Sequence, residues 1–261
     1  MNRSLEQWAE LSLLVAREAG QLARVGWRSR PRVFHKGVAD LVTEYDLASE
    51  RLIRERLAQL APGLDIVGEE EGGSARSGTA WYCDPIDGTT NFAHGHPFWA
   101  VSVALVEGGQ PLVGAVVAPC LDLEWVGWGG VARRNGVDCR VSVTGSLADS
   151  LCATGFPRDM GKAAETNIAA FERTTRATRG VRRCGSAAID LCLVADGTYD
   201  GYWEHALGAW DVAAGIAIIR AAGGTVTHLH GGPPRLDDAH VLATNGRLHE
   251  PLSALLNESF Q

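Results

Sequence analysis

The 261-residue sequence predicts an α/β protein whose helices and sheets pack in layers. Its first half has helical patterns followed by strand patterns, and its second half alternates strand with helix. Hydrophobic residues make up 46% of the chain and charged residues 21%, which is typical of a globular protein. We find no repeat, low-complexity segment or clear linker. We therefore expect a single domain over residues 1–261, with an N-terminal lobe at about 1–145 and a C-terminal lobe at about 146–261 that share a cleft.

The first lobe is expected to contain helices packed on a mixed or antiparallel sheet. Ser4 and Gln7 match a capping box at the start of a long amphipathic helix that ends near Arg28. A second helix is expected at residues 47–60, with Asp46 as its N-cap. Strand patterns follow at residues 64–67, 80–83, 98–106, 111–118, 123–128 and 139–143.

The second lobe is expected to alternate strands and helices, as a layered α/β unit does. Helices are predicted at residues 163–178, 187–195, 209–222 and 247–256. Strands are predicted at residues 181–186, 200–203, 225–229 and 240–244. We expect the strand at 200–203 to end at Glu204. This glutamate is then either a solvated acid or a functional one.

The stretch WYCDPIDGTTNFAHG at residues 81–95 carries the strongest chemical signal. Asp84 and Asp87 come directly after an apolar strand pattern, and a buried carboxylate must be paired or hold a metal. Oxygen ligands of this type favour Mg²⁺, Mn²⁺ or Ca²⁺ over zinc. Gly88 and Thr89 N–H groups that open a helix would bind phosphate, and the Thr89 hydroxyl could orient a water molecule. The alternative is a polar β-turn at the Asp-Pro and Asp-Gly pairs.

Further acids stand at the ends of other predicted elements. Glu69 belongs to an acidic run, Asp211 precedes a small-residue helix, and Asp40 and Asp46 flank a short polar segment. If these ends converge, two or more Mg²⁺ ions could share the carboxylates, which is an arrangement suited to phosphoryl transfer. The alternatives are a solvated loop for the acidic run, an N-cap for Asp211 and core packing for Trp210.

The composition argues against several other classes of protein. A formal net charge of -7 and a pI of about 5.6 disfavour a nucleic-acid partner. No apolar run is long enough to span a bilayer and we recognise no signal peptide, so we expect no membrane partner. The six cysteines form no Cys-x-x-Cys pair, which favours reduced cysteines in a cytoplasmic protein. The eight histidines show no metal-ligand spacing, and we expect His228 and His230 to be ordinary strand or loop residues.

Two motifs resemble those of the inositol monophosphatase family of metal-dependent, lithium-sensitive phosphatases. They are DPIDGTTNF at residues 84–92 and WDVAAG at residues 210–215. GEE at residues 68–70 and DLVTEYD at residues 40–46 extend the match in the family's order across nearly the whole chain. The resemblance implies an alternating αβαβα sandwich of the inositol monophosphatase and fructose-1,6-bisphosphatase type. It also implies a homodimer.

The resemblance also implies a ligand set for two or three Mg²⁺ ions, with Mn²⁺ as a substitute. Glu69, Asp84 and the carbonyl of Ile86 would hold the ion that activates water. Asp84, Asp87 and Asp211 would hold the second ion on the leaving-group side.

The remaining roles are implied in the same way. Thr89 and Glu69 would position the attacking water, with Asp84 also catalytic, and no covalent enzyme intermediate would form. Asp46 would support the site or hold a weaker third ion through water. The residues expected to contact substrate are Asp87, Gly88, Thr89, Gly185, Ser186, Ala187, Glu204 and Asp211.

The sequence departs from the family pattern at two positions. Because three acids run together, Glu70 could replace Glu69 if the loop register shifts. Lys36 lies one residue too close to Asp40 to match the family's lysine, so we give it no role.

The expected function is Mg²⁺-dependent hydrolysis of a small phosphate monoester, with inositol 1-phosphate as the first choice. The alternatives within the same chemistry are histidinol phosphate, fructose 1,6-bisphosphate and 3′-phosphoadenosine 5′-phosphate. A further alternative is a regulatory binding protein that keeps the site but acts through a partner.

Overall fold

The computed structural model describes the chain apart from residues 1–2, 36–40, 77, 158–160, 162–165 and 258–261. Lys36 and Asp40 therefore lie outside the described residues. The helices are α1 (Leu5–Gly26), α2 (Glu44–Leu60), α3 (Thr89–Ala93), the 3₁₀ turn η1 (Leu147–Asp149), α4 (Ile168–Ala177), α5 (Ala187–Ala195), α6 (Ala209–Ala221) and α7 (His249–Asn257). The strands are β1 (Val33–His35), β2 (Leu41–Thr43), β3 (Asp65–Gly68), β4 (Thr79–Asp87), β5 (Ala100–Glu107), β6 (Gln110–Ala118), β7 (Leu123–Trp128), β8 (Val131–Arg134), β9 (Val137–Asp138), β10 (Leu151–Thr154), β11 (Gly180–Arg182), β12 (Gly201–Leu207), β13 (Thr225–His228) and β14 (Ala239–Thr244).

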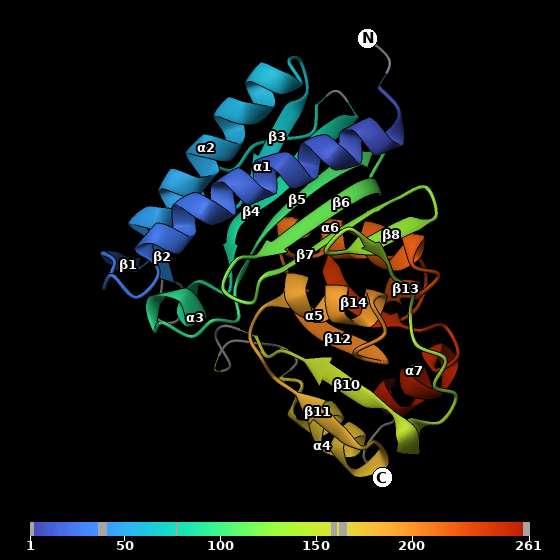
Figure 1. The fold of residues 1–261 in the computed structure, drawn as a ribbon. Helices are drawn as coiled ribbons and strands as arrows, with labels where there is room; N and C mark the ends of the chain where they lie inside the picture. Colours follow the sequence, from blue (N-terminus) through green and yellow to red (C-terminus); the bar gives the residue numbers. More distant parts are fainter. Residues whose placement is uncertain (1–2, 36–40, 77, 158–160, 162–165, 258–261) are drawn as a thin grey trace.

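The elements stack as five alternating layers of helix and sheet (Figure 1). Helices α1 and α2 cover the outer face of a seven-stranded sheet, and α5 and α6 lie between that sheet and a five-stranded sheet. Helices α4 and α7 pack on the outer face of the second sheet. The predicted αβαβα sandwich is thus confirmed.

Both large sheets mix parallel and antiparallel strands. The first has the order β3-β4-β5-β6-β7-β8-β9, in which only β3 and β4 are parallel. The second has the order β11-β10-β12-β14-β13, with parallel pairs on both sides of β10 and antiparallel pairs on both sides of β14. The hairpin predicted between residues 98–106 and 111–118 is the β5–β6 pair.

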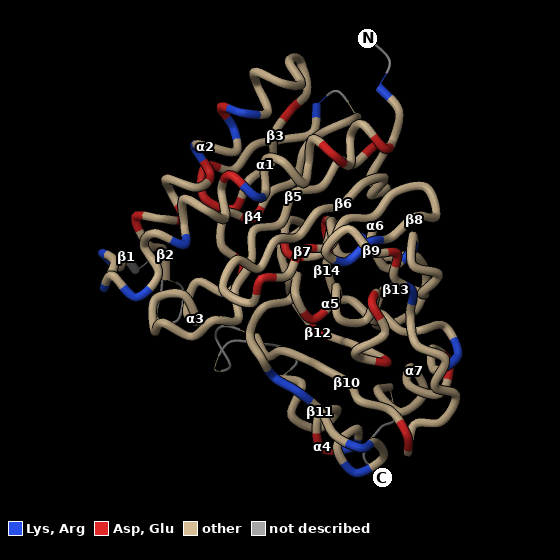
Figure 2. The backbone as a smooth tube through the Cα atoms, in the orientation of Figure 1, with Lys and Arg blue, Asp and Glu red and all other residues tan. Residues whose placement is uncertain are grey.

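The outer helices divide into apolar and charged faces. Helix α1 begins at the predicted capping box of Ser4 and Gln7, and its alanine and leucine side chains face the first sheet. Helix α2 carries both acidic and basic residues along its length (Figure 2). Two of its acids, Asp46 and Glu50, are nevertheless fully buried. A buried acid on an otherwise solvated helix requires a specific partner, which the site described below provides.

Helix α6 packs closely on the first sheet where two of its strands carry glycine. A Cβ atom on Gly114 of β6 would lie 2.3 Å from the carbonyl oxygen of Ala214. A Cβ atom on Gly127 of β7 would lie 2.6 Å from the Cα of Ile218. Gly215, the last residue of WDVAAG, lets Leu191 of α5 approach in the same way. These glycines fix the depth at which α6, and therefore Asp211 in its first turn, is inserted between the sheets.

Several predicted boundaries were wrong. Thr43, rather than Asp46, is the N-cap of α2; Asp46 stands at the third helical position and completes a capping box by accepting the Thr43 N–H. Residues 139–143 form no strand, because the sheet ends with the short strand β9 before them. The pairing of β1 with β2 was not predicted from the sequence.

Two elements of the second lobe also differ from expectation. Helix α4 begins at Ile168, because Asn167 before it has a left-handed backbone and its side chain binds Thr154 and Gly155; residues 163–165 of the predicted helix lie outside the described residues. Strand β12 continues through Glu204 to Leu207, so Glu204 is not at a strand end. None of the helices in the described ranges has both the length and the apolar character needed to cross a membrane.

Close packing of α6 on the glycines of the sheet gives a stability prediction. We expect Gly114→Ala to lower the free energy of unfolding by about 1–3 kcal/mol, because the added methyl overlaps the helix backbone. Urea denaturation would measure the loss. Gly145→Ala is the control: its added Cβ would have no atom within 4 Å, so its stability should stay within about 0.5 kcal/mol of the parent. Equal stabilities of the two variants would contradict the packing argument.

Candidate active site

Three buried carboxylates from two distant segments meet between the two sheets. Asp84 and Asp87 lie at the end of β4, and Asp211 lies in the first turn of α6. One oxygen atom from each of the three lies within 4.8 Å of the other two. All three residues are less than a tenth exposed. We call Asp84, Asp87 and Asp211 the carboxylate cluster.

The end of β4 has the irregular backbone that this arrangement needs. The β4–β5 register shifts between Asp84 and Asp87, and such irregularities redirect side chains. Ile86 anchors the segment, because its fully buried side chain packs with Phe92 and Trp99. Its N–H donates to Asp84 Oδ1 at 2.9 Å. The segment WYCDPIDG is therefore a strand end shaped around two acids, not a solvated turn.

Protein donors hold one oxygen of each remaining acid. Asp87 Oδ2 accepts hydrogen bonds from the Ser186 hydroxyl and, at 2.7 Å, from the Ala188 N–H. Asp211 Oδ2 accepts the Gly208 N–H at 2.6 Å, so Asp211 does contribute to capping α6 as well as belonging to the cluster. These bonds fix the orientation of both carboxylates before any ligand arrives.

The cluster is electrostatically costly by itself. Burial, and then the charges of Glu69, Asp87 and Asp211, hold the pKa of Asp84 well above its ordinary range. Burial and the charge of Asp211 raise the pKa of Asp87 to about 7, although its bonds from Ser186 and Ala188 act in the opposite direction. A divalent cation among these oxygens would remove the repulsion. The residues present therefore fit a hard metal ion.

Glu69 is the member of the acidic run whose charge acts on the pKa values of the cluster. Its charge contributes to the raised pKa values of Asp84, Asp87 and Asp46. Glu50 holds the loop that carries Glu69. Its buried carboxylate accepts the N–H groups of Glu70 and Glu71 at 2.7 and 3.0 Å. This clamp holds the backbone of Glu70 and Glu71 against α2.

Thr89 connects the segment after β4 to α2. Gly88, with φ of 94°, precedes α3, and Thr89 is the first residue of that helix, as predicted. The Thr89 hydroxyl lies 3.1 Å from both Asp46 Oδ1 and the Ile86 carbonyl, and it can donate to one of them at a time. Burial raises the pKa of Asp46 to about 6, with Thr43 and Thr89 opposing the shift. The buried Asp46 can therefore orient the Thr89 hydroxyl by accepting its hydrogen bond.

A cavity of about 320 Å³ opens beside the cluster. Asp87 and Asp211 lie on its wall together with Gly88, Thr89 and Glu204. Gly185, Ala187 and Trp210 also line the cavity. Trp210 is only partly buried and belongs to none of the hydrophobic clusters, so the alternative prediction of core packing for it was wrong. Ser186 does not line it: its side chain is buried behind the wall, where it binds Asp87.

Glu204 projects into this cavity from the middle of β12. Its carboxylate accepts a hydrogen bond from the Tyr202 hydroxyl on the same face of the strand. Burial, with the charges of Asp211 and Asp87, raises the pKa of Glu204 to about 8. Gly155 makes room for it, since a Cβ atom there would lie 2.1 Å from the carboxylate. Glu204 is thus a packed, polar part of the wall and not a solvated acid.

Sequence reasoning missed three charged residues of the site. Glu50 was overlooked although it interrupts the buried face of α2, and that interruption was visible in the sequence. Arg183 lines the cavity and lowers the pKa of Glu204 against the effect of burial. Asp190 is buried in α5, and burial followed by the charge of Glu204 holds its pKa well above the usual range. No motif in the sequence marked the last two.

The pattern model described as the inositol monophosphatase family matches residues 4–261. The chain belongs to the inositol monophosphatase family. Its members are metal-dependent phosphatases, so the resemblance seen in the motifs is confirmed.

Individual relatives cover almost the whole chain. An inositol-1-monophosphatase of Synechocystis sp. is 41% identical over 97% of this chain and 89% of its own length. A fructose-1,6-bisphosphatase/inositol-1-monophosphatase of Aquifex aeolicus is 36% identical over 95% of this chain and 94% of its own. The solved inositol monophosphatase of Anabaena (Nostoc) is 37% identical and superposes with a TM-score of 0.87, covering 97% of this chain and 96% of the other.

The raised pKa values predict a pH-dependent effect of metal on stability. Asp46 and Asp87 have folded pKa values of about 6 and about 7, above the ordinary 3.8. Their contribution to stability is therefore complete below about pH 4 and is lost as the pH rises through these folded values. Mg²⁺ should offset the loss, because it binds the ionised carboxylates.

We expect the melting temperature in EDTA to fall between about pH 4 and pH 7, and the gain on adding Mg²⁺ to widen over the same interval. Differential scanning fluorimetry would measure both curves. Asp87→Asn removes one titrating group and should flatten the EDTA curve. A Mg²⁺ effect that is the same at every pH would contradict the role of these carboxylates.

Proposed function

We propose that the protein is a Mg²⁺-dependent phosphomonoesterase for a small phosphorylated polyol, with inositol 1-phosphate as its main substrate. The observation that carries the proposal is the carboxylate cluster, buried between the sheets and open to a cavity that Gly88 and Thr89 also line. A cavity of about 320 Å³ suits a small ligand. Family membership and the printed names of the relatives support the same choice.

In this proposal the acids bind two cations. Glu69, Asp84 and the Ile86 carbonyl hold one Mg²⁺ ion, and Asp84, Asp87 and Asp211 hold the other. When bound, Mg²⁺ supplies positive charge that lowers the pKa of water and stabilises the leaving oxygen. Asp46 supports Thr89, and it is also the nearest candidate for a weaker third ion held through water. Mn²⁺ would fit the same oxygen donors.

Thr89 and Glu69 position the attacking water. A Thr89 hydroxyl that donates to Asp46 keeps its lone pairs available to accept a hydrogen bond from that water. Glu69 is held close by the Glu50 clamp on its loop and accepts a proton from the same water. The N–H groups of Gly88 and Thr89 bind the phosphate oxygens, so the water and the phosphorus atom are held in one orientation.

The other end of the cavity recognises the alcohol part of the substrate. Glu204 binds substrate hydroxyls, and Tyr202 keeps its carboxylate in place. Gly185 and Ala187 line the same cavity. Arg183 adds a positive charge on the wall, which would attract an anionic substrate into an otherwise acidic cavity.

Fructose 1,6-bisphosphate is the second candidate substrate, since the Aquifex relative carries both activities in its name. Histidinol phosphate and 3′-phosphoadenosine 5′-phosphate share the chemistry and belong in the same test. A regulatory binding protein is disfavoured because every residue assigned to metal and water is present. We also propose a homodimer, as the family resemblance implies, and a cytoplasmic location, which the six free cysteines support.

The direct test is phosphate release from the four candidate substrates with Mg²⁺, with and without EDTA. We expect inositol 1-phosphate to have the highest kcat/KM and EDTA to abolish turnover. Comparable or faster hydrolysis of another substrate would change the substrate assignment but keep the metal chemistry. Failure to hydrolyse any of them, in a folded protein that binds Mg²⁺, would favour the binding-protein alternative.

Two variants separate the metal end of the site from the alcohol end. Asp87→Asn should lower kcat at least about a hundredfold, because residues that only support metal ligands already cost 10–100-fold when mutated. Glu204→Gln should mainly raise KM for inositol 1-phosphate and change the order of preferred substrates. Glu10→Gln, an exposed acid on α1, is the control and should leave both constants unchanged. Equal effects of Asp87→Asn and Glu204→Gln on kcat alone would contradict this division.

A further inference from the structure

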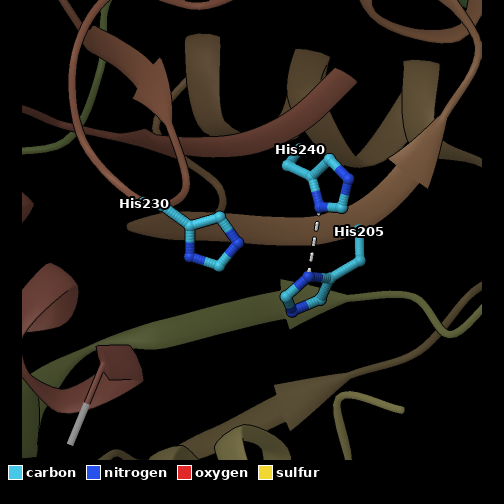
Figure 3. A group of neighbouring side chains, drawn as sticks. All are labelled: His205, His230 and His240. Atoms are coloured by element: carbon cyan, nitrogen blue, oxygen red, sulfur yellow. Dashed lines mark hydrogen bonds between the residues drawn. The ribbon is translucent and has the colours of Figure 1, made fainter. Parts of the chain in front are cut away.

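A second group of potential metal ligands lies on the other side of β12. His205, His230 and His240 each offer one ring nitrogen, and these nitrogens lie within 4.8 Å of one another. The three rings point toward one another (Figure 3). His205 is buried, His240 is partly exposed and His230 is exposed. We call these three residues the histidine cluster.

The backbone brings the three residues together from separate elements. His205 on β12 and His240 on β14 face each other across an antiparallel pair whose register shifts between Glu204 and Leu207. Ala206, inside this irregularity, has φ of 56°, which is uncommon for a residue other than glycine. Bulges of this kind redirect a side chain, here next to His205.

A tight turn adds His230. The His228 N–H donates to the Gly232 carbonyl at 3.1 Å, and the Leu229 N–H donates to the His240 carbonyl at 2.9 Å. The His230 N–H donates to Nδ1 of His228 at 3.2 Å. The turn after β13 is therefore closed by its own hydrogen bonds and fastened to β14 through Leu229, and the His230 and His240 ring centroids lie 5.8 Å apart.

The distance between two of the nitrogens matches a metal site. His205 Nδ1 and His240 Nδ1 are 3.4 Å apart. Zn–N bonds of about 2.0–2.1 Å in a tetrahedron give a nitrogen–nitrogen distance of about 3.3–3.4 Å. A hydrogen bond between two neutral rings would explain this pair alone, but it would not explain why the third ring converges on it.

Asp238 contacts the ring nitrogen of His240 that faces away from the cluster, as a carboxylate commonly does beside a metal-binding histidine. Nε2 of His240 lies 3.3 Å from Asp238 Oδ1, which favours the tautomer with its proton on Nε2 and leaves the Nδ1 lone pair facing His205. The other oxygen of Asp238 lies 3.6 Å from Nε2 of His228, a buried nitrogen with no hydrogen bond within the described residues. Asp238 thus orients His240 and also contacts the histidine that fastens the turn.

We propose that His205, His230 and His240 form a binding site for one divalent transition-metal ion, with Zn²⁺ as the representative. Imidazole nitrogens favour Zn²⁺, Cu²⁺ and Ni²⁺, whereas the carboxylate cluster offers the oxygen donors that Mg²⁺ prefers. Three protein ligands leave one coordination position open to water or to a small anion. His205 and His230 both line a second cavity of about 390 Å³, through which the ion can enter. Bound there, the ion joins β12, β14 and the turn after β13.

Zn²⁺ binding in the presence of excess Mg²⁺ tests this proposal without reference to phosphatase activity. We expect isothermal titration calorimetry to show one Zn²⁺ equivalent bound by the full-length protein, with a rise in melting temperature. His230→Ala should weaken the binding at least about a hundredfold, because it removes one of three ligands. His230 is exposed, so the variant should fold. His94→Ala, in an exposed loop outside the cluster, is the matched control and should bind Zn²⁺ as the parent does.

Two further measurements distinguish this site from the carboxylate cluster. Asp211→Asn should retain the Zn²⁺ equivalent, and X-ray absorption at the zinc edge should show imidazole scattering from three histidines. The proposal is overturned if the parent binds no Zn²⁺ in excess Mg²⁺, or if His230→Ala binds it as tightly as His94→Ala does. Loss of binding in Asp211→Asn but not in His230→Ala would likewise assign the ion to the carboxylates.

Discussion

Mutual repulsion among three buried carboxylates is the constraint around which this molecule is built. Asp84, Asp87 and Asp211 are less than a tenth exposed, and one carboxylate oxygen of each lies within 4.8 Å of the other two. Such a cluster is unfavourable unless hydrogen bonds and a cation compensate it. The protein supplies the hydrogen bonds through the N–H groups of Ile86, Ala188 and Gly208 and the hydroxyl of Ser186. The close fit of α6 on a glycine-bearing sheet keeps Asp211 from moving away from the other two. The repulsion among these carboxylates thus destabilises the folded protein at a place where a bound metal ion would offset it.

Helix α2 supports this site from outside the cavity through two acids one turn apart. Asp46 contacts Thr89, and Glu50 holds the loop that carries Glu69. Gly68 permits the second contact, because a Cβ there would lie 2.2 Å from the Glu50 carboxylate. Both acids are fully buried, so each orients a group that faces the cavity without itself being open to solvent. This arrangement joins the outermost helical layer to the chemistry at the centre of the molecule.

Strand β12 serves two polar environments with different donor chemistry. Glu204 lines the first cavity and is held by the buried Tyr202, while His205 belongs to a nitrogen-rich cluster with His230 and His240. Alternation of side chains along a strand separates the two sets, and the irregularity after Glu204 adjusts the position of the second. Oxygen and nitrogen donors select different ions, so the two clusters need not compete for the same metal.

The sequence by itself determined the layered α/β class, most of the helices and strands, and the family, because hydrophobic periodicity and the segments around Asp84 and Asp211 are local patterns. It suggested Gly88 and Thr89 only as a conditional helix start, and the structure has Gly88 as the N-cap and Thr89 as the first residue of α3. It misplaced the cap of α2, although the Thr43–Asp46 capping box is a local pattern, and it misplaced the end of β12, where pairing with β14 extends the strand. Only the tertiary structure decided which acid of the run 69–71 approaches the cluster, what Glu50 and Arg183 contact, and that His205 meets His240. These outcomes depend on contacts between residues far apart in the chain, and neither the spacing of residues nor their local propensity encodes such contacts.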